Sequence, residues 1–147
     1  MTRRSVLRLL DANANRALEG LRVCEDIVRF HLGWAALYRR LRALRHAIAA
    51  AVNRLPVSRM DLIRARASRQ DVGRTASSAR VESLERLLAV NFQRAKESLR
   101  TLEECARLME PRRRIAPRHH AAFQRLRFRV YDTERAVLLK LAAVRHP

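Results

Sequence analysis

NANRALEGLRVCEDIVR, residues 13–29, recurs further along the chain as NFQRAKESLRTLEECAR, residues 91–107. Placed in register, the two copies share charged and polar residues as well as apolar ones. The matched pairs are Asn13 with Asn91, Arg16 with Arg94, Ala17 with Ala95, Glu19 with Glu97, Leu21 with Leu99, Arg22 with Arg100, Glu25 with Glu103 and Arg29 with Arg107. A repeat of this kind indicates that one structural unit is present twice.

Both copies have the composition of an α-helix, because they are rich in good helix formers and contain no proline. On a helical wheel each copy carries an apolar stripe. Asn13 and Arg16 fall within the apolar arc of the first copy, and Asn91 and Arg94 fall within that of the second. We therefore expect both arginines to be buried. A buried guanidinium needs a partner, which is either a carboxylate of the bundle or an anionic ligand.

The composition of the 147-residue chain indicates one helical domain with a core of its own. Aromatic residues make up 5% and glycine and proline are few, which favours helix over sheet. The net charge is +18, and only Lys96 and Lys140 of the 32 basic residues are lysines. Arginine binds two phosphate oxygens at once, so the charge suggests either a phosphate-bearing partner or an arginine-rich surface.

The two cysteines, Cys24 and Cys105, fall on apolar helical positions, so we expect small buried hydrophobic residues in a reducing cytosol. The chain has no CxxC motif or Cys/His cluster, which argues against a zinc site. The sequence shows no signal peptide and no apolar run long enough to span a membrane. We therefore expect a cytoplasmic protein without a membrane partner.

Four segments with helical periodicity are predicted, interrupted at Gly33, Pro56 and Pro111. The first ends near residue 31, the second covers 34–55, the third runs from a serine cap at Ser77 or Ser78 to residue 109, and the fourth covers 118–144. A second, weaker repeat pairs RRLR at residues 39–42 with QRLR at residues 124–127. The sequence thus predicts an all-α domain, residues 1–147, in which hairpin 5–55 is duplicated as hairpin 77–144. This is an antiparallel four-helix bundle whose pseudo-two-fold axis brings the two Asn/Arg/Glu sets together.

The middle connection, residues 56–76, is unusually long for a compact bundle. It contains a turn signal, Asp71-Val72-Gly73, with Arg66, Arg69 and Arg74 around it. Long basic connections of this type serve either as binding loops or as flexible crossovers, and the sequence leaves both alternatives open.

No P-loop, GxGxxG, HExxH or nucleophile-elbow motif is present. What remains is a set of arginines placed toward the core, two repeated asparagines and several carboxylates. Arg45 lies in the apolar stripe of the second helix, and Arg127 lies at the edge of the stripe of the fourth. Such a set suits phosphate groups with Mg²⁺, because arginines hold the oxygens while one or two carboxylates hold the metal.

Five motifs, in the same order, resemble those of the small monofunctional hydroxymethylpyrimidine phosphate kinases. These kinases occur alone or fused to the N-terminus of thiamine-phosphate synthase. The motifs are LLDANANRALEGLRVCED, LRH at residues 44–46, DVG at 71–73, NFQRAKESLRTLEE and LRFRVYDTE at 126–134. No synthase barrel follows them, so the resemblance implies a stand-alone member.

The resemblance implies transfer of the γ-phosphoryl group of ATP to 4-amino-5-hydroxymethyl-2-methylpyrimidine phosphate, which gives the diphosphate for thiamine synthesis. It implies ATP and Mg²⁺ as cofactors, small-molecule substrates and an association with thiamine-phosphate synthase, and it leaves a homodimer open. The alternative from another class is a basic helical bundle that binds nucleic acid. The spread of charge over all helices, the few aromatics and the lack of a recognised binding motif argue against it.

The residue roles are our inference on positions that match these motifs. Arg16, Arg94, Glu19 and Glu97 are the expected catalytic residues, and Glu19 and Glu97 are also the expected Mg²⁺ ligands. The expected substrate and phosphate ligands are Asn13, Asn91, Arg45, Asp71, Gly73 and Arg127.

Overall fold

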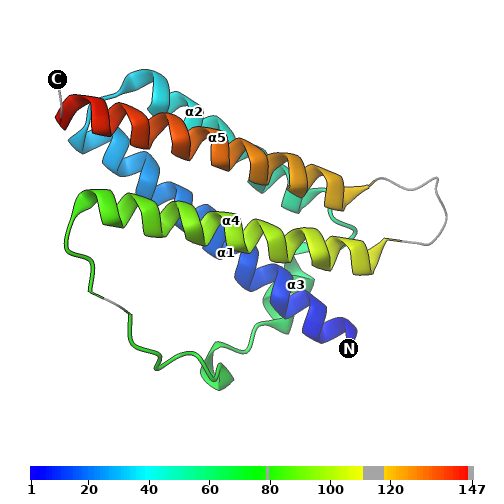
Figure 1. Ribbon diagram of the computed structural model, residues 1–147. Coiled ribbons are helices and arrows are strands. Elements are labelled where there is room, and N and C mark those ends of the chain that lie inside the picture. Colours follow the sequence, from blue (N-terminus) through cyan, green and yellow to red (C-terminus); the bar gives the residue numbers. More distant parts are fainter. Residues whose placement is uncertain (79, 111–117, 146–147) are drawn as a thin grey trace.

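The computed structural model describes the whole chain except residues 79, 111–117 and 146–147 (Figure 1). Its elements are α1 (Arg3–Asp26), a π-helical turn (Ile27–His31), α2 (Ala35–Asn53), α3 (Arg59–Ala65), a 3₁₀ turn (Ser68–Gln70), α4 (Leu84–Met109) and α5 (His119–Arg145). The described residues contain no strand, so the all-α prediction is confirmed. None of the described helices combines the length and the apolar character needed to cross a membrane.

The four long helices form an antiparallel bundle, as the sequence predicts (Figure 1). Helix α1 packs against α2 and α4, and α5 packs against the same two helices. Figure 1 shows α1 and α5 running in one direction and α2 and α4 in the other, so each helix is antiparallel to both of its neighbours. The hairpin of α1 and α2 therefore corresponds to the hairpin of α4 and α5.

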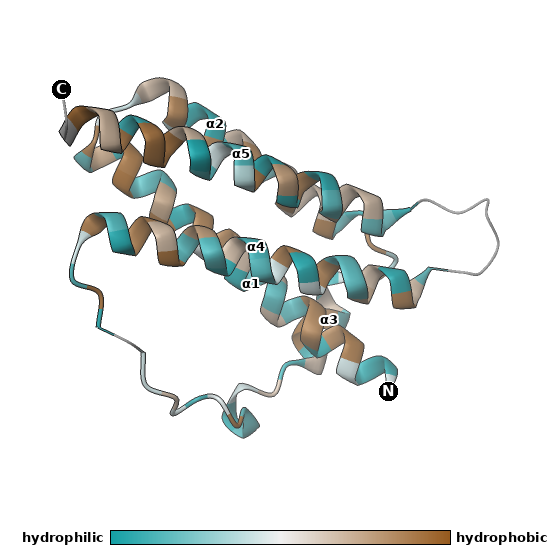
Figure 2. Ribbon diagram, in the orientation of Figure 1, coloured by the Kyte–Doolittle hydropathy of each residue, from teal (hydrophilic) through white to brown (hydrophobic). Residues whose placement is uncertain are grey.

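The core consists of the apolar stripes of the four long helices. Figure 2 shows hydrophobic residues recurring along each helix between hydrophilic ones, which is the pattern of a helix with one buried face. Fully buried residues come from every long helix and include Leu10 and Leu21, Leu41 and Ile48, Phe92 and Leu99, and Phe123 and Val130. Each such side chain contributes about 1.5–3 kcal/mol relative to exposure, so their burial dominates the stability of the fold.

The helix ends agree with the predictions in most places and differ in one. Gly33 has a φ of 66°, the left-handed conformation that glycine adopts at a tight corner. Helix α4 begins at Leu84 rather than near residue 77, because Ser83 accepts a hydrogen bond from the Arg86 backbone and caps it. The prediction that Ser77 or Ser78 caps this helix is therefore wrong. The predicted stop at Pro111 lies outside the described residues, as do residues 112–117 of the arginine-rich stretch that follows it.

Helix α3 is a short helix within the connection that the sequence analysis did not separate. Its first turn is a capping box in which Ser58 and Asp61 exchange hydrogen bonds between side chain and backbone. Leu62 and Ala65 bury its inner face, and α3 packs against α1. The first part of the connection is thus fixed to the bundle.

Helices α1 and α4 approach each other closely at Gly20. A Cβ atom built on Gly20 would lie 2.8 Å from the backbone oxygen of Asn91, closer than real Cβ contacts allow. Gly20 therefore permits an approach of backbone to backbone that any other residue would force apart. The equivalent position in the repeat is Ser98, which is also buried.

We expect Gly20→Ala to lower the free energy of unfolding by about 1 kcal/mol. Overpacking costs about 1–3 kcal/mol, and the higher helix propensity of alanine returns only about 1 kcal/mol. Chemical denaturation measures the difference. Ser98→Ala is the matched control, because it removes atoms at the equivalent position; a Gly20→Ala protein as stable as Ser98→Ala would contradict the close approach.

Candidate functional site

A cleft of about 780 Å³ lies between α1 and α4, and we call it the central cleft. Its lining consists of five residues of α1 and the five residues that match them in the repeat on α4. These pairs are Asn13 with Asn91, Arg16 with Arg94, Glu19 with Glu97, Gly20 with Ser98 and Val23 with Thr101. The cleft therefore lies on the pseudo-two-fold axis of the bundle, where the duplication was expected to bring the two sets together.

The paired asparagines of the central cleft are buried and held in the same way. Asn13 Nδ2 donates to the Leu9 carbonyl and Asn91 Nδ2 donates to the Leu87 carbonyl, both at 2.9 Å. These bonds fix both amides against their own helices. In the part of the chain that the structure describes, neither Oδ1 atom accepts a hydrogen bond. Each asparagine thus retains acceptor capacity, and one further N–H donor, for a group in the cleft.

The paired arginines, Arg16 and Arg94, are exposed, so the prediction of buried guanidinium groups is wrong. Neither makes an ion pair or a hydrogen bond with any residue that the structure describes. A helical wheel places both arginines within the apolar arc. In the structure, this part of the arc faces the central cleft instead of packing against another helix. Pairing with a bundle carboxylate is therefore not their role, and both charges remain available to an anion.

Glu19 and Glu97 lie at the exposed edge of the same cleft. Glu97 accepts a hydrogen bond of 2.8 Å from Gln93 Nε2. Among the described residues, no three or more carboxylate, histidine or cysteine side chains gather in a way that could hold a metal ion alone. Mg²⁺ bound here would need phosphate oxygens and water beside one or both glutamates, and this is how Mg²⁺ binds in many phosphotransfer sites.

The connection forms a wall of a second cavity beside the central cleft. This cavity, the first outer pocket, has a volume of about 530 Å³ and includes Asp71, Asn13 and Arg16 in its lining. Arg66 joins the connection to α1 through two hydrogen bonds of 2.7 Å to Asp11, and this interaction raises the pKa of the guanidinium. Asp71 is thus brought close to the predicted site, while Gly73 lies in the same turn and donates its N–H to Asp71 Oδ1.

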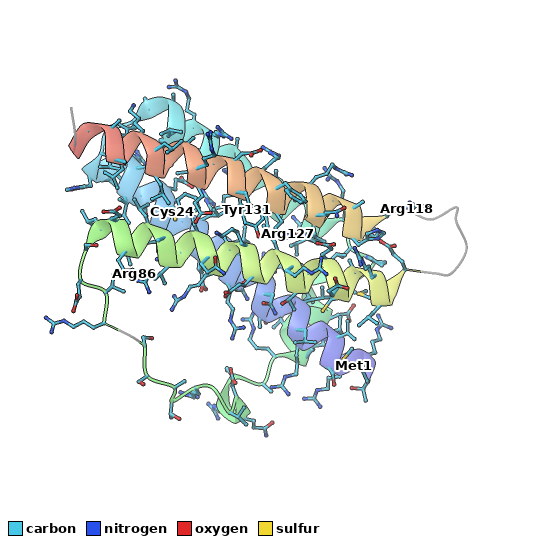
Figure 3. The ribbon with its side chains drawn as sticks, viewed as in Figure 1. Met1, Cys24, Arg86, Arg118, Arg127 and Tyr131 are labelled. Atoms are coloured by element: carbon cyan, nitrogen blue, oxygen red, sulfur yellow. The ribbon has the colours of Figure 1, made fainter. Side chains whose placement is uncertain are left out.

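Arg45 and Arg127 are not in the lining of the central cleft; they bind buried carboxylates. Arg45 donates to Glu25 at 2.6 Å, and Arg127 donates to Glu103 at 3.1 Å. Glu25 and Glu103 are equivalent in the repeat, so the same carboxylate joins the two helices of each hairpin through an arginine. Figure 3 shows Arg127 pointing from α5 toward α4. A phosphate role for Arg45 or Arg127 stays a prediction.

Some lining residues escaped the sequence analysis although the sequence contains a signal for them. The repeat extends upstream, since RLL at residues 8–10 matches RLL at residues 86–88. Arg8 lines the first outer pocket, and Arg86 lines another pocket at the start of α4 (Figure 3). A longer alignment of the two copies would have found both arginines. Arg66 was identified only as one of the arginines around the turn, because its contact with Asp11 depends on how the connection folds back onto α1.

The cysteines lie within the core and take no part in the site. Burial raises the pKa of the Cys24 thiol, and burial also raises that of Cys105. A thiol that stays protonated is a poor nucleophile, so neither cysteine is suited to thiolate chemistry. The prediction that both cysteines are small buried hydrophobic residues is confirmed.

Comparison with known proteins gives a consistent set of similarities. The sequence profile of the ThiD2 family matches residues 8–136. A thiamine-phosphate synthase of Rhodopirellula baltica is 38% identical over 144 residues, which cover 96% of this chain and 36% of that protein. A thiamine-phosphate synthase of a Synechocystis species is 37% identical over 137 residues, covering 91% and 36% respectively. The chain thus spans about a third of the length of these relatives. No solved structure matches it.

The two classes of arginine lead to opposite expectations for stability. Arg45→Met should lower the free energy of unfolding by roughly 2–3 kcal/mol, because Glu25 would stay buried with only Arg22, at 3.6 Å, as partner. Arg16→Met should change it by less than about 0.5 kcal/mol, since Arg16 makes no ion pair or hydrogen bond with a described residue. Denaturant unfolding of both variants measures the contrast, and equal stabilities would contradict the division into paired and unpaired arginines.

Proposed function

The chain belongs to the ThiD2 family, and on that premise we propose that it is an ATP-dependent kinase of thiamine biosynthesis. Its acceptor would be 4-amino-5-hydroxymethyl-2-methylpyrimidine phosphate, and its products the pyrimidine diphosphate and ADP. The observation that carries this proposal is the central cleft, where unpaired Arg16 and Arg94 occupy equivalent positions on opposite walls. The relatives named thiamine-phosphate synthase support a link to the same pathway.

The proposed reaction requires little from the protein in the way of proton transfer. A phosphate monoester has its second pKa near about 6, so the acceptor oxygen is already ionised at neutral pH. That oxygen attacks the γ-phosphorus, a new P–O bond forms, and the bond from the γ-phosphorus to the β,γ-bridging oxygen breaks. ADP leaves with the electron pair. No general base is needed, and no histidine is among the described residues that line the central cleft.

The main barrier in this reaction is the repulsion between two phosphate-bearing substrates, together with their alignment. Arg16 and Arg94 would each hold one phosphoryl-bearing group from opposite sides of the cleft, with Asn13 and Asn91 orienting the same groups. Glu19 and Glu97 would hold Mg²⁺ together with the phosphate oxygens, or would orient the arginines. Binding energy from a guanidinium fork is available only to a substrate with a phosphate, which favours the phosphate over the free alcohol.

We expect Arg16→Met and Arg94→Met each to lower turnover by on the order of 10³, as when a charge clamp on a transferring phosphoryl group is lost. Both variants should keep their fold, because neither arginine has a partner in the described structure. A coupled assay of ADP release with the pyrimidine phosphate as acceptor measures the effect. Arg39→Met, an exposed arginine on α2 outside every cavity described above, is the control. Folded variants with the activity of Arg39→Met would exclude the clamp.

We also expect the connection to become protected when both substrates bind. Asp71 and the 3₁₀ turn lie beside Arg16, so phosphate groups in the cleft would draw this basic segment onto them. Hydrogen exchange at residues 64–76 should slow in the presence of ATP, Mg²⁺ and the pyrimidine phosphate, relative to the free protein. Unchanged exchange at saturating ligand would mean that the segment is only a crossover between helices.

A further inference from the structure

The central cleft has a further pocket on each side, and we call this row of three neighbouring cavities across α1 and α4 the trough. The first outer pocket shares Asn13 and Arg16 with the cleft. On the other side, a second outer pocket of about 460 Å³ shares Arg94 and Glu97 with it. Each outer pocket therefore adjoins the central cleft at one of its two arginines.

The two outer pockets occupy equivalent places in the repeat. Arg8, Ala12 and Arg16 line the first pocket, and their counterparts Arg86, Val90 and Arg94 line the second. The duplicated helices thus supply two similar half-sites around one centre. Two different substrates can be distinguished by what the rest of the chain adds to each half and by the positions at which the two copies differ.

The connection lines the first outer pocket, and none of its described residues lines the second. Arg66, Ala67, Ser68 and Asp71 complete the lining of the first pocket, and the anchor for this wall is the bidentate ion pair of Arg66 with Asp11. The counterpart of Asp11 on α4 is Ala89, which cannot hold such an arginine. Asp71 Oδ2 has no bonding partner among the residues that the structure describes, so it is free to accept a hydrogen bond from a ligand.

Helix α5 lines the second outer pocket, and none of its described residues lines the first. Glu134 enters the lining of the second pocket, and Lys96 holds this carboxylate at 2.6 Å, with both side chains largely buried. The counterpart of Lys96 on α1 is Leu18, so the first half has no such arrangement. The ion pair occupies Glu134 Oε2, and Oε1 has no hydrogen-bond donor among the residues that the structure describes.

We propose that the first outer pocket takes the adenosine end of the phosphoryl donor and that the second takes the aminopyrimidine ring of the acceptor. This assignment rests on the proposed kinase function. The first pocket is the larger of the two. Its Asp71 and Ser68 can bind ribose hydroxyls, and an adenine base can pack against Leu9, Ala12 and Ala67. Arg8, Arg16 and Arg66 along it suit a triphosphate, which carries more charge than a monophosphate. In the smaller second pocket, the free oxygen of Glu134 accepts from an exocyclic amino group.

A pair of substitutions at equivalent positions tests the assignment. Ala12→Phe fills the first outer pocket and Val90→Phe fills the second. Isothermal titration calorimetry, with ATP and Mg²⁺ or with the pyrimidine phosphate as titrant, measures each ligand by itself. We expect Ala12→Phe to weaken ATP by about tenfold or more with little effect on the pyrimidine phosphate, and Val90→Phe to do the reverse. The opposite pattern, or equal loss of both ligands in both variants, would overturn the assignment.

A second pair keeps the test decisive if a bulky variant fails to fold. Asp71→Asn keeps the oxygen that accepts from Gly73, and Glu134→Gln keeps the side-chain shape. The first should raise the KM for ATP and the second the KM for the pyrimidine phosphate, each by roughly tenfold, the effect of losing one hydrogen bond to a charged group. A wild-type protein that binds both ligands while these sensitivities are exchanged would refute the assignment and leave the kinase proposal intact. A wild-type protein that binds neither ligand would refute both.

Discussion

The close contact between α1 and α4 at Gly20 is the constraint on which the rest of the structure depends. Because no side chain separates Gly20 from the Asn91 backbone, the two copies of the repeat meet directly across the pseudo-two-fold axis. Asn13 and Asn91 are buried beside this contact, and Arg16 and Arg94 emerge just beyond it at the central cleft. A wider separation of the helices would move the two arginines apart and remove the shared lining.

The arginines of this basic chain serve two physical purposes. Those that meet buried carboxylates, Arg45 with Glu25 and Arg127 with Glu103, join the helices within each hairpin. Those that line the central cleft, Arg16 and Arg94, make no ion pair with any residue that the structure describes, although Glu19 and Glu97 share the lining with them. A net charge of +18 therefore says little by itself. The distribution of partners is what separates an anion site from structural ion pairs.

Much of this arrangement was accessible from the sequence, because helical periodicity and an internal repeat are local signals. They predict the bundle and its antiparallel order, and they place Asn13, Arg16 and Glu19 opposite their counterparts. The exposure of Arg16 could not be predicted from the sequence. A helical wheel does not show whether an apolar arc packs against another helix or faces a cleft. The start of α4 was misplaced because three serines could each cap it, and only Ser83 does. The position of Asp71 depends on the hydrogen bond from Arg66 to Asp11. These two residues are distant in sequence, and no local sequence pattern predicts their contact.

The central claim is that both phosphate-bearing substrates meet in one trough between Arg16 and Arg94. Titration calorimetry with a bisubstrate analogue, in which a phosphate chain joins adenosine to the aminopyrimidine, tests it most directly. Linking the two ligands should give one analogue bound per chain, with an affinity at least about 10²-fold above that of ATP. That gain should disappear in Arg16→Met and in Arg94→Met. An analogue that binds no more tightly than ATP, and equally well to both variants, would contradict the account.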